Sequence, residues 1–395
     1  MRQVLVTGAT GFIGCRLAEV AVARGIPVVG LVRQWSHAAR LGRLPVRLVG
    51  GDVLHPDSLR GAMSDCDVVF HCAVDNRAGG KAHRATSVQG TVNVMQAALE
   101  LGVKRVVHLS STAVYSYQPR PEAATEEGMY RYSGDVYCDG KIDGEKAALR
   151  YWHDHGLPVS VLRPTIVYGP FGFHTAQTAT IIRDRRMVLL NGGAGICNSL
   201  YVDNLVEAML LAADHAGAPG QVFHISDATP VSWKEFIEAH ARALGDSYLP
   251  LPEMTGQGME AAWAKLAAYG RANSSWKQGL RLIRDPETRE ALKSLPLVKP
   301  SLHMGKSLAK AALPASIRQS LRQRLLNSNT SGSPMNSSSS GPRSILSRSE
   351  LSMFTLFSEV AFSTEKARRI LGYEPAIDFS EGMRRSAAWI QWARL

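Results

Sequence analysis

The sequence predicts an α/β fold built on a doubly wound parallel sheet. Short apolar runs alternate with helical patterns through the first half of the chain, as such a sheet requires. The apolar runs are nearly continuous stretches of Val and Leu, which is typical of parallel strands buried on both faces. A length of 395 residues leaves room for a second, smaller lobe after the sheet.

The expected elements follow one another in the order that this fold needs. Strands of the sheet are predicted at residues 3–7, 28–32, 46–50, 68–71, 105–110 and 159–163. Helices between them are predicted at 11–24, 56–63, 88–101 and 141–155. A looser pattern follows, with elements at 199–202, 204–213, 222–225 and 232–244. Near the end of the chain, Ser363 or Thr364 caps a helix that Gly372 ends, and 380–392 forms a closing helix.

A glycine-rich turn joins the first strand to the first helix. Gly8, Gly11 and Gly14 are spaced G-x-x-G-x-x-G. Glycines in such a turn let the backbone approach a pyrophosphate, and the amides at the N-terminus of the next helix point at its negative charge. A tight turn without a ligand is the alternative, but this spacing between strand and helix favours a dinucleotide site.

Composition and charge narrow the class of protein. Hydrophobic residues make up 45% of the chain and charged residues 20%, as in ordinary globular proteins, and no apolar run reaches the ~18 residues of a membrane span. The five cysteines form no C-x-x-C pair and indicate reduced thiols, with neither a disulfide framework nor a metal site. The first strand begins at once and leaves no room for a signal peptide, so we expect a cytoplasmic protein.

The net charge of +11 is concentrated in one part of the chain, residues 253–350, which we interpret as an insertion. Eight Lys and Arg residues lie between Lys299 and Arg348 with no acidic residue among them, and no nucleic-acid-binding motif accompanies them. The Ser/Asn-rich tract 327–343 lacks the apolar surface to order itself. Residues 306–326 predict a basic amphipathic helix. We expect an ordinary surface helix there, with weak peripheral contact to an anionic membrane as the alternative.

Two further clusters carry chemistry. Tyr137 and Lys141 are four residues apart and therefore project from one face of a helix. An ammonium so close to a phenol is expected to lower the pKa of the tyrosine and make it an acid/base at neutral pH. Ser111 follows a buried strand, at the sheet edge where ligands bind in open α/β folds, and could orient a substrate hydroxyl or carbonyl against Tyr137.

Taken together, these motifs resemble the extended short-chain dehydrogenase/reductase superfamily, in particular its NAD-dependent epimerase/dehydratase branch. The motifs that carry the resemblance are Thr7-Gly8-Ala9-Thr10-Gly11-Phe12-Ile13-Gly14, Ser110-Ser111, Tyr137-x-x-x-Lys141, Leu162-Arg163-Pro164-Thr165-Ile166-Val167-Tyr168-Gly169-Pro170 and Tyr201-Val202-Asp203-Asn204. The resemblance covers residues 1–244 and resumes at 362–392. It implies a Rossmann domain at 1–165 and a substrate lobe, interleaved with the last sheet elements, at 166–252 and 351–395.

The resemblance also implies roles for single residues. Ser111, Tyr137 and Lys141 would form the catalytic trio, with Tyr137 as acid/base while the nicotinamide exchanges hydride with a carbinol carbon. The other residues expected to contact the cofactor are Gly8, Thr10, Gly11, Phe12, Ile13, Gly14, Arg33, Asp52, Val53, Cys72, Ala73, Val74, Pro164 and Val167. A homodimer is implied as well.

The choice of cofactor rests on the end of the second strand. NAD sites place an acid there to accept bonds from the ribose hydroxyls, whereas this chain has Arg33 and no acid in the next positions. An arginine suits a 2′-phosphate, so the sequence favours NADP, with NAD as the alternative.

Departures from the family pattern bear on the substrate. Thr112-Ala113 stands where the sugar-nucleotide dehydratases have Asp-Glu, and Cys197 stands where many epimerases place an arginine on the diphosphate. The leading hypothesis is an enzyme that epimerises or reduces a sugar or nucleotide sugar. The alternative is an NADPH-dependent reductase or dehydrogenase of an apolar alcohol, similar to the 3β-hydroxysteroid dehydrogenase or dihydroflavonol reductase branches.

Overall fold

The computed structural model describes residues 3–395 except 75–79, 118, 185–186, 188, 246–252 and 255–358. Nearly all of the predicted insertion, and with it the expected helix at 306–326 and the tract 327–343, lies outside the described residues. The described residues belong to one compact unit, formed by residues 1–259 and 351–395. No helix among them is long and apolar enough to cross a membrane.

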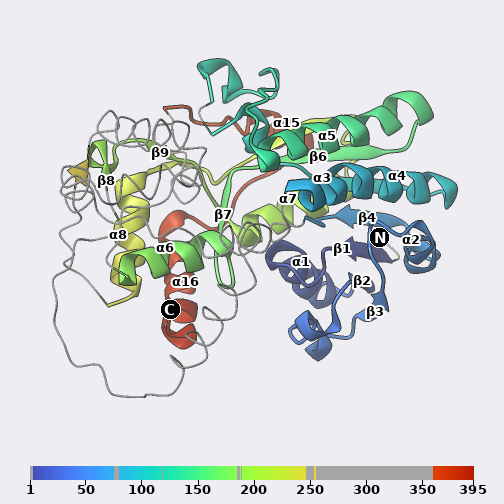
Figure 1. The fold of residues 1–395 in the computed structure, drawn as a ribbon, viewed down its shortest axis with the longest axis horizontal. Helices are drawn as coiled ribbons and strands as arrows, with labels where there is room; N and C mark the ends of the chain where they lie inside the picture. Colours follow the sequence, from blue (N-terminus) through green and yellow to red (C-terminus); the bar gives the residue numbers. More distant parts are fainter. Residues whose placement is uncertain are drawn as a thin grey trace, which may run out of the picture. The chain divides into compact units, whose positions relative to one another are not determined.

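A seven-stranded sheet forms the centre of this unit (Figure 1). Its strands in spatial order are β3 (Arg47–Gly50), β2 (Val28–Val32), β1 (Val4–Thr7), β4 (Val68–His71), β5 (Arg105–Leu109), β6 (Val159–Pro164) and β11 (Val222–Ile225). Every neighbouring pair is parallel. The strand order reverses direction at β1, so the carboxyl ends of β1 and β4 flank the crevice where such folds bind ligands. The predicted fold class is confirmed.

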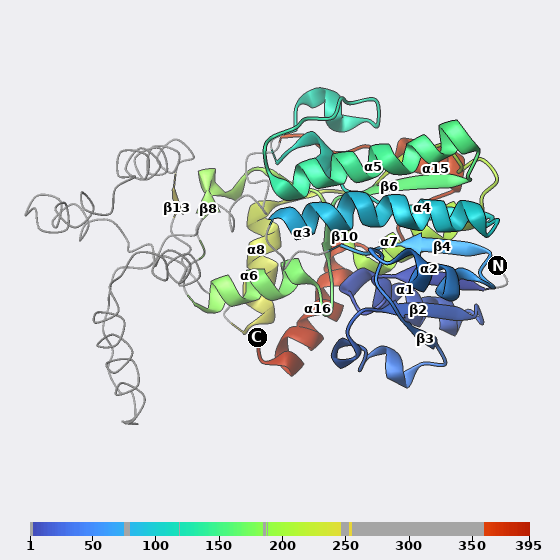
Figure 2. The ribbon, with the colours of Figure 1, turned by 45° about the vertical axis from the view of Figure 1, so that its right-hand side comes forward.

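Helices cover both faces of the sheet (Figure 2). One face carries α2 (Pro56–Met63), α4 (Gly90–Glu100) and α5 (Val136–His155). The other carries α1 (Phe12–Ala23), α7 (Val202–Asp214) and α15 (Glu365–Leu371). The last of these belongs to the end of the chain, so the C-terminal residues complete a layer that begins at the N-terminus.

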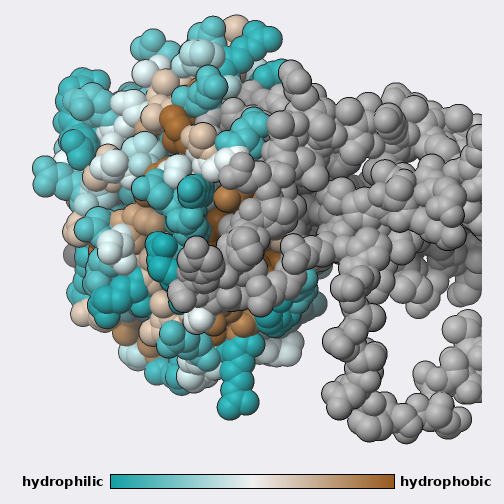
Figure 3. All heavy atoms as spheres, turned by 90° about the vertical axis from the view of Figure 1, so that its left-hand side faces the viewer, coloured by the Kyte–Doolittle hydropathy of each residue, from teal (hydrophilic) through white to brown (hydrophobic). Residues whose placement is uncertain are grey.

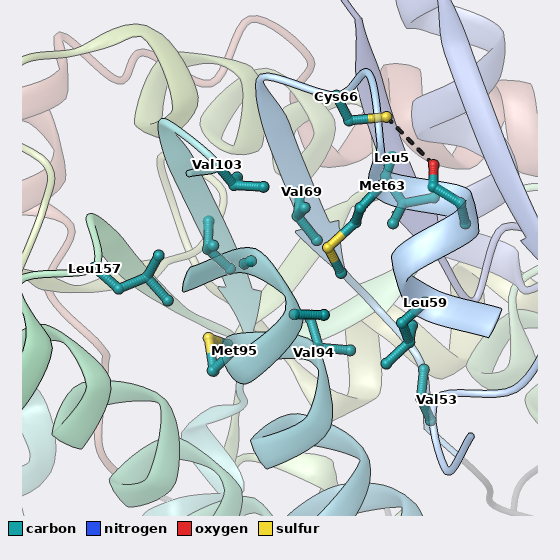
Figure 4. Close-up of a cluster of buried hydrophobic side chains, with 14 of the residues drawn as sticks. Leu5, Val53, Leu59, Met63, Cys66, Val69, Val94, Met95, Val103 and Leu157 are labelled. Carbon is teal, nitrogen blue, oxygen red and sulfur yellow. Dashed lines mark hydrogen bonds between the residues drawn. The ribbon is translucent and has the colours of Figure 1, made fainter. Parts of the chain in front are cut away.

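The core between the sheet and α2, α4 and α5 explains why the strands are so apolar (Figure 4). Leu5 and Val69 point from β1 and β4 toward Leu59 and Met63 of α2 and Val94 of α4, and all five side chains are fully buried. Burying a side chain of this size contributes about 1.5–3 kcal/mol. The core therefore holds the sheet and these helices in a fixed register.

A smaller lobe follows the sheet. It contains α6 (Phe173–Arg183), α8 (Trp233–Ala243) and α16 (Phe379–Ala393), which pack against one another. Short paired strands connect them: β7 (Ile166–Tyr168) with β10 (Ser199–Tyr201), β9 (Ile196–Cys197) with β12 (Val231–Ser232), and β8 (Leu189–Leu190) with β13 (Glu253–Met254). The face drawn in Figure 3 carries apolar surface between hydrophilic side chains.

Three differences from the predicted elements are informative. Helix α5 begins at Val136, five residues before the predicted start, because the Asp135 carboxylate accepts bonds from the Tyr137 and Cys138 amides, both at 3.0 Å. Helix α4 is preceded by α3 (Gly80–Arg84) and a π-helical turn, η3 (Ala85–Gln89). Helix α6 was not expected at all.

Short 3₁₀ turns lie between these elements: η1 (Trp35–His37), η2 (Leu41–Arg43), η4 (Thr112–Tyr115), η5 (Pro121–Ala124) and η6 (Asn191–Gly193).

Candidate active site

The glycine-rich turn between β1 and α1 is shaped so that only glycine fits. Gly8 has a φ of +67°, and a Cβ there would lie 2.9 Å from the backbone of Ala73, which follows β4. A Cβ on Gly14 would overlap the carbonyl oxygen of Gly8. The turn is therefore pressed against the end of β4, and its outer side, at Gly11, is exposed.

The N-terminus of α1 has the character of an anion site. Gly11 occupies the cap position without a side-chain bond to the helix, and the first turn holds no acidic residue. The amides of this turn are thus uncapped by any side chain, and the positive end of the helix dipole faces outward. Thr10, Phe12 and Ile13 belong to the same turn. These features fit the pyrophosphate of a dinucleotide.

The expected adenosine contacts lie at the ends of β2 and β3. Arg33 directly follows β2 and is exposed. Asp52 follows β3, and its Oδ1 accepts a bond of 2.9 Å from the Leu54 amide, which fixes the loop. Val53 is buried and packs against Gly90 at the start of α4. Only part of the surface of Asp52 and Val53 can therefore face a ligand.

The other expected cofactor residues surround the turn. The Ala73 amide donates to the Thr7 hydroxyl at 3.3 Å, which ties the segment Cys72–Val74 to the end of β1. Pro164 ends β6, and its carbonyl accepts a bond of 3.4 Å from Thr112. Val167 lies in β7 and is buried. The loop after β7 reaches back to the turn, because a Cβ on Gly172 would lie 3.0 Å from the Phe12 ring.

The proposed trio meets where β5 ends against α5. Ser111 caps the 3₁₀ turn η4, and its Oγ accepts a bond of 3.1 Å from the Ala113 amide. Tyr137 lies in the first turn of α5, and the Ser111 hydroxyl lies near enough to its phenol to lower the pKa of that group. Lys141 lies one turn later, and its Nζ donates to the Leu109 carbonyl at 2.8 Å. The structure therefore brings together three residues that are up to 30 positions apart in the sequence.

The pKa of Tyr137 is shifted in the opposite direction to the one expected from the sequence. Burial raises the pKa of Tyr137, and the nearby Ser111 hydroxyl opposes that rise only in part. This is opposite to the direction expected from the lysine spacing. The reason is that the Lys141 ammonium lies 5.9 Å from the centre of the tyrosine ring and is turned toward the Leu109 carbonyl. Burial in turn lowers the pKa of Lys141 to about 8.

Sequence reasoning missed the polar groups directly beneath this site. Glu145 and Arg163 form a buried ion pair, with an Nη2–Oε1 distance of 2.5 Å. The Thr7 hydroxyl bonds to the ring of His71 at 2.8 Å, and His71 bonds on its other side to Thr91 at 3.0 Å. Glu145 could have been found from its position four residues after Lys141, because that spacing repeats the one between Tyr137 and Lys141.

Fold and site together define a dinucleotide-binding α/β protein with a Ser/Tyr/Lys cluster at the crevice of its sheet. The model of the NAD-dependent epimerase/dehydratase family matches residues 4–226. The chain belongs to this family, which is part of the extended short-chain dehydrogenase/reductase type, and the expected resemblance is confirmed.

Several curated relatives are similar over 60–66% of the chain. A 4-hydroxy-2-methyl-3-oxo-4-farnesyl-3,4-dihydroquinoline-1-oxide ketoreductase of Stigmatella aurantiaca is 32% identical over 60% of this chain and 71% of its own. A 3β-hydroxysteroid dehydrogenase/Δ5→4-isomerase of Mycobacterium tuberculosis is 29% identical over 66% of this chain and 74% of its own. A UDP-glucose 4-epimerase of Mycolicibacterium smegmatis is 31% identical over 62% of this chain and 83% of its own.

Solved structures show the same fold. The UDP-glucose 4-epimerase of Thermotoga maritima superposes with a TM-score of 0.64 at 16% identity, over all of both chains. At this identity the likeness supports the architecture alone.

Proposed function

We propose that this chain is an NAD(P)-dependent oxidoreductase that transfers hydride at a secondary alcohol or ketone carbon. The observation that carries the proposal is the meeting of Ser111, Tyr137 and Lys141 at the end of β5, on the same edge of the parallel sheet as the glycine-rich turn after β1. The bound nicotinamide supplies the hydride. Ser111 and Tyr137 hold the substrate oxygen, and the Tyr137 hydroxyl supplies or removes its proton. A phenol whose pKa burial raises is protonated at neutral pH, which suits an acid in ketone reduction.

Lys141 has a positioning and electrostatic role in this proposal. Its Nζ is fixed by the Leu109 carbonyl, on the side of α5 that also carries Tyr137. From there it can contact the ribose of the nucleotide. NADP is the proposed cofactor, because Arg33 stands at the end of β2 with no acid to accept bonds from the ribose hydroxyls.

The substrate we favour is an apolar ketone or alcohol. Cys197, at the position where a diphosphate-binding arginine is expected, is fully buried in β9, and burial raises the pKa of its thiol. That position therefore supplies no cation. Arg183, an arginine that precedes this position in the chain and could have replaced that cation, pairs with Asp184 at 3.2 Å. The similarity to a ketoreductase of a farnesylated quinoline oxide and to a 3β-hydroxysteroid dehydrogenase supports the same choice.

Epimerisation of a nucleotide sugar is the second candidate. The 31% identity to a UDP-glucose 4-epimerase favours it. The two candidates differ in how they use the cofactor, because an epimerase returns the hydride that it takes and can retain its nucleotide, whereas a reductase must exchange it. Denaturing the purified protein and identifying any released nucleotide distinguishes them. Retained NAD points to the epimerase, and an empty protein that oxidises NADPH with hydrophobic ketones points to the reductase.

Replacing Tyr137 by Phe tests the chemistry itself. Loss of the hydroxyl should lower kcat by at least about 100-fold, the range of a general acid's contribution, and leave the Kd for NADPH within about twofold. Steady-state NADPH oxidation and fluorescence titration of the nucleotide measure the two quantities. Tyr151→Phe is the matched control, since Tyr151 lies on the same helix but bonds to Gln96 at the surface. Full turnover in Tyr137→Phe would contradict the proposed role.

A further inference from the structure

The ion pair of Glu145 and Arg163 is buried beside the proposed active site, yet neither residue has a role in the proposed reaction. Their side chains are 0% and 4% exposed. A buried ion pair is weak evidence for stability, because the cost of removing two charges from water offsets much of their attraction. The position of this pair therefore needs another explanation.

Three side chains donate hydrogen bonds to the Glu145 carboxylate, and both of its oxygens accept them. Ser110 donates to Oε2 at 2.5 Å. Tyr130 donates to Oε1 at 2.8 Å, and the Arg163 guanidinium reaches both oxygens, with Nε at 3.1 Å from each. Such a set of donors fixes the orientation of the carboxylate.

The bond to Ser110 links the carboxylate to the proposed catalytic residues. Tyr137, Lys141 and Glu145 follow one another at four-residue intervals on α5, so they share one side of the helix. Lys141 bonds to Leu109, and Glu145 bonds to Ser110. Helix α5 thus holds two consecutive residues at the end of β5, immediately before Ser111.

The arginine fixes this arrangement to the next strand. Arg163 lies in β6, which pairs with β5 in parallel. Its Nη1 donates to the hydroxyl of Tyr115, which in turn bonds to the ring of His224 in β11 at 2.8 Å. The side chains that bond to Glu145 therefore come from β6 and from the segment after β5, and they fix the carboxylate to the sheet.

We propose that Glu145 is a positioning residue that, through Ser110, sets the distance between Ser111 and Tyr137. This inference rests on the proposed function of the Ser111, Tyr137 and Lys141 trio. It adds two residues, Glu145 and Ser110, that do not touch the substrate but determine whether the trio is aligned. A displacement of about 1 Å at such a site can lower a rate by about 100-fold.

Two single substitutions separate positioning from simple packing. Ser110→Ala removes the bond that links Glu145 to β5, and we expect kcat to fall roughly 10- to 100-fold with KM and the NADPH Kd within about twofold. Tyr130→Phe is the matched control. It also removes one hydroxyl bond to the same carboxylate, but Arg163 still anchors that oxygen. We expect its kcat to stay within about twofold of the unsubstituted enzyme. An unchanged kcat in Ser110→Ala, or an equal loss in Tyr130→Phe, would overturn the inference.

A second variant tests the carboxylate directly. Glu145→Gln alone leaves Arg163 unpaired and can fail to fold, so the double variant Glu145→Gln/Arg163→Met is used. The negative charge of Glu145 raises the pKa of Lys141 against the effect of burial. The double variant should therefore lose kcat, and the alkaline limit of its kcat/KM should move to lower pH, whereas Ser110→Ala keeps that limit. A folded double variant with unchanged kcat, or with an unmoved limit, contradicts the inference.

Tyr137→Phe is measured beside these variants, with the same hydrophobic ketone and NADPH. If Tyr137→Phe retains turnover, both the proposed function and this inference are wrong. If Tyr137→Phe is inactive while Ser110→Ala is unaffected, only this inference fails.

Discussion

Arg33 is the residue on which the choice between NADP and NAD depends. It directly follows β2, at the edge of the sheet where the adenosine ribose is expected, and its side chain is exposed. Arg33→Ala should weaken NADPH binding by about 10- to 100-fold, the range of a charge-assisted bond, and change NADH binding little. Fluorescence titration with both nucleotides measures this difference.

The control for this substitution is Arg60→Ala. Arg60 is also a surface arginine, but it pairs with Asp57 and Glu100 on the outer helices. It should leave both affinities unchanged. Equal losses of NADPH and NADH affinity in Arg33→Ala would remove the argument for NADP.

At the scale of residues, the sequence predicted the residues whose role depends on their own chemistry or on the local backbone conformation. Gly8 and Gly14 could be identified because a turn of this shape excludes any Cβ. Glu145 and Arg163 were missed, because charged residues are expected at the surface and only tertiary packing shows that these two are buried. The raised pKa of Tyr137 was missed for a similar reason, since the burial that raises it exists only in the folded chain.

At the scale of elements, helix α5 packs unusually close to the π-helical turn η3. A Cβ on Gly144 would lie 2.5 Å from the Ser87 carbonyl oxygen, and backbone on both sides cannot shift cheaply. Gly144→Ala should therefore lower the free energy of unfolding by about 1–3 kcal/mol. Unfolding by urea measures this change.

Gly61→Ala is the matched control, because Gly61 lies inside α2 and a Cβ added there would meet no atom within 4 Å. There the higher helix propensity of alanine should add about 0.5–1 kcal/mol. A Gly144→Ala protein as stable as the unsubstituted one would show that α5 and η3 can separate without cost.

The strands of the central sheet were predicted to within a residue, whereas helices α3 and α6 and most short strands of the smaller lobe were not predicted. Buried parallel strands have a continuous apolar pattern that is visible in the sequence. Helix α6 lacks such a pattern, because its buried side includes Thr175 and Thr178 in place of larger apolar residues. The Thr175 hydroxyl accepts a bond of 3.0 Å from the Gly169 amide, a contact that exists only in the folded chain.

At the scale of the whole described unit, histidines whose pKa is lowered by burial should make the fold sensitive to acid. His71, His108, His224 and His240 are at most 4% exposed, and burial lowers the pKa of each, to about 3 for His71 and His224 and to about 4 for His240. Below the unfolded value of about 6.5, the unfolded chain binds protons that the folded chain excludes, so stability falls as the pH falls. Asp227 has the opposite effect on stability. Burial raises its pKa to about 6, so below that pH the folded chain binds one proton more readily than the unfolded chain does.

We therefore expect the melting temperature to fall by about 10 °C between pH 7.5 and pH 5, as several kcal/mol of linkage imply. Scanning calorimetry across this range measures it. His240→Asn keeps a donor for the Phe236 carbonyl and should make the decline shallower, whereas replacing the exposed His153 by Asn should not. A melting temperature that is constant from pH 7.5 to pH 5 would contradict the expectation.

The contacts made by residues 359–393 determine when the smaller lobe can fold during synthesis. The Asn198 side chain bonds to the backbone of Val360 and Phe362, and Asn204 bonds in the same way to Ile377. Helix α16 then packs against α8. During synthesis, the polar groups of Asn198 and Asn204 and the apolar side of α8 lack these partners until residues 359–393 have left the ribosome. The sheet can begin to assemble on the nascent chain, but the smaller lobe must wait for these residues, so a chain that terminates before them carries an exposed α8 surface and becomes a substrate for chaperones.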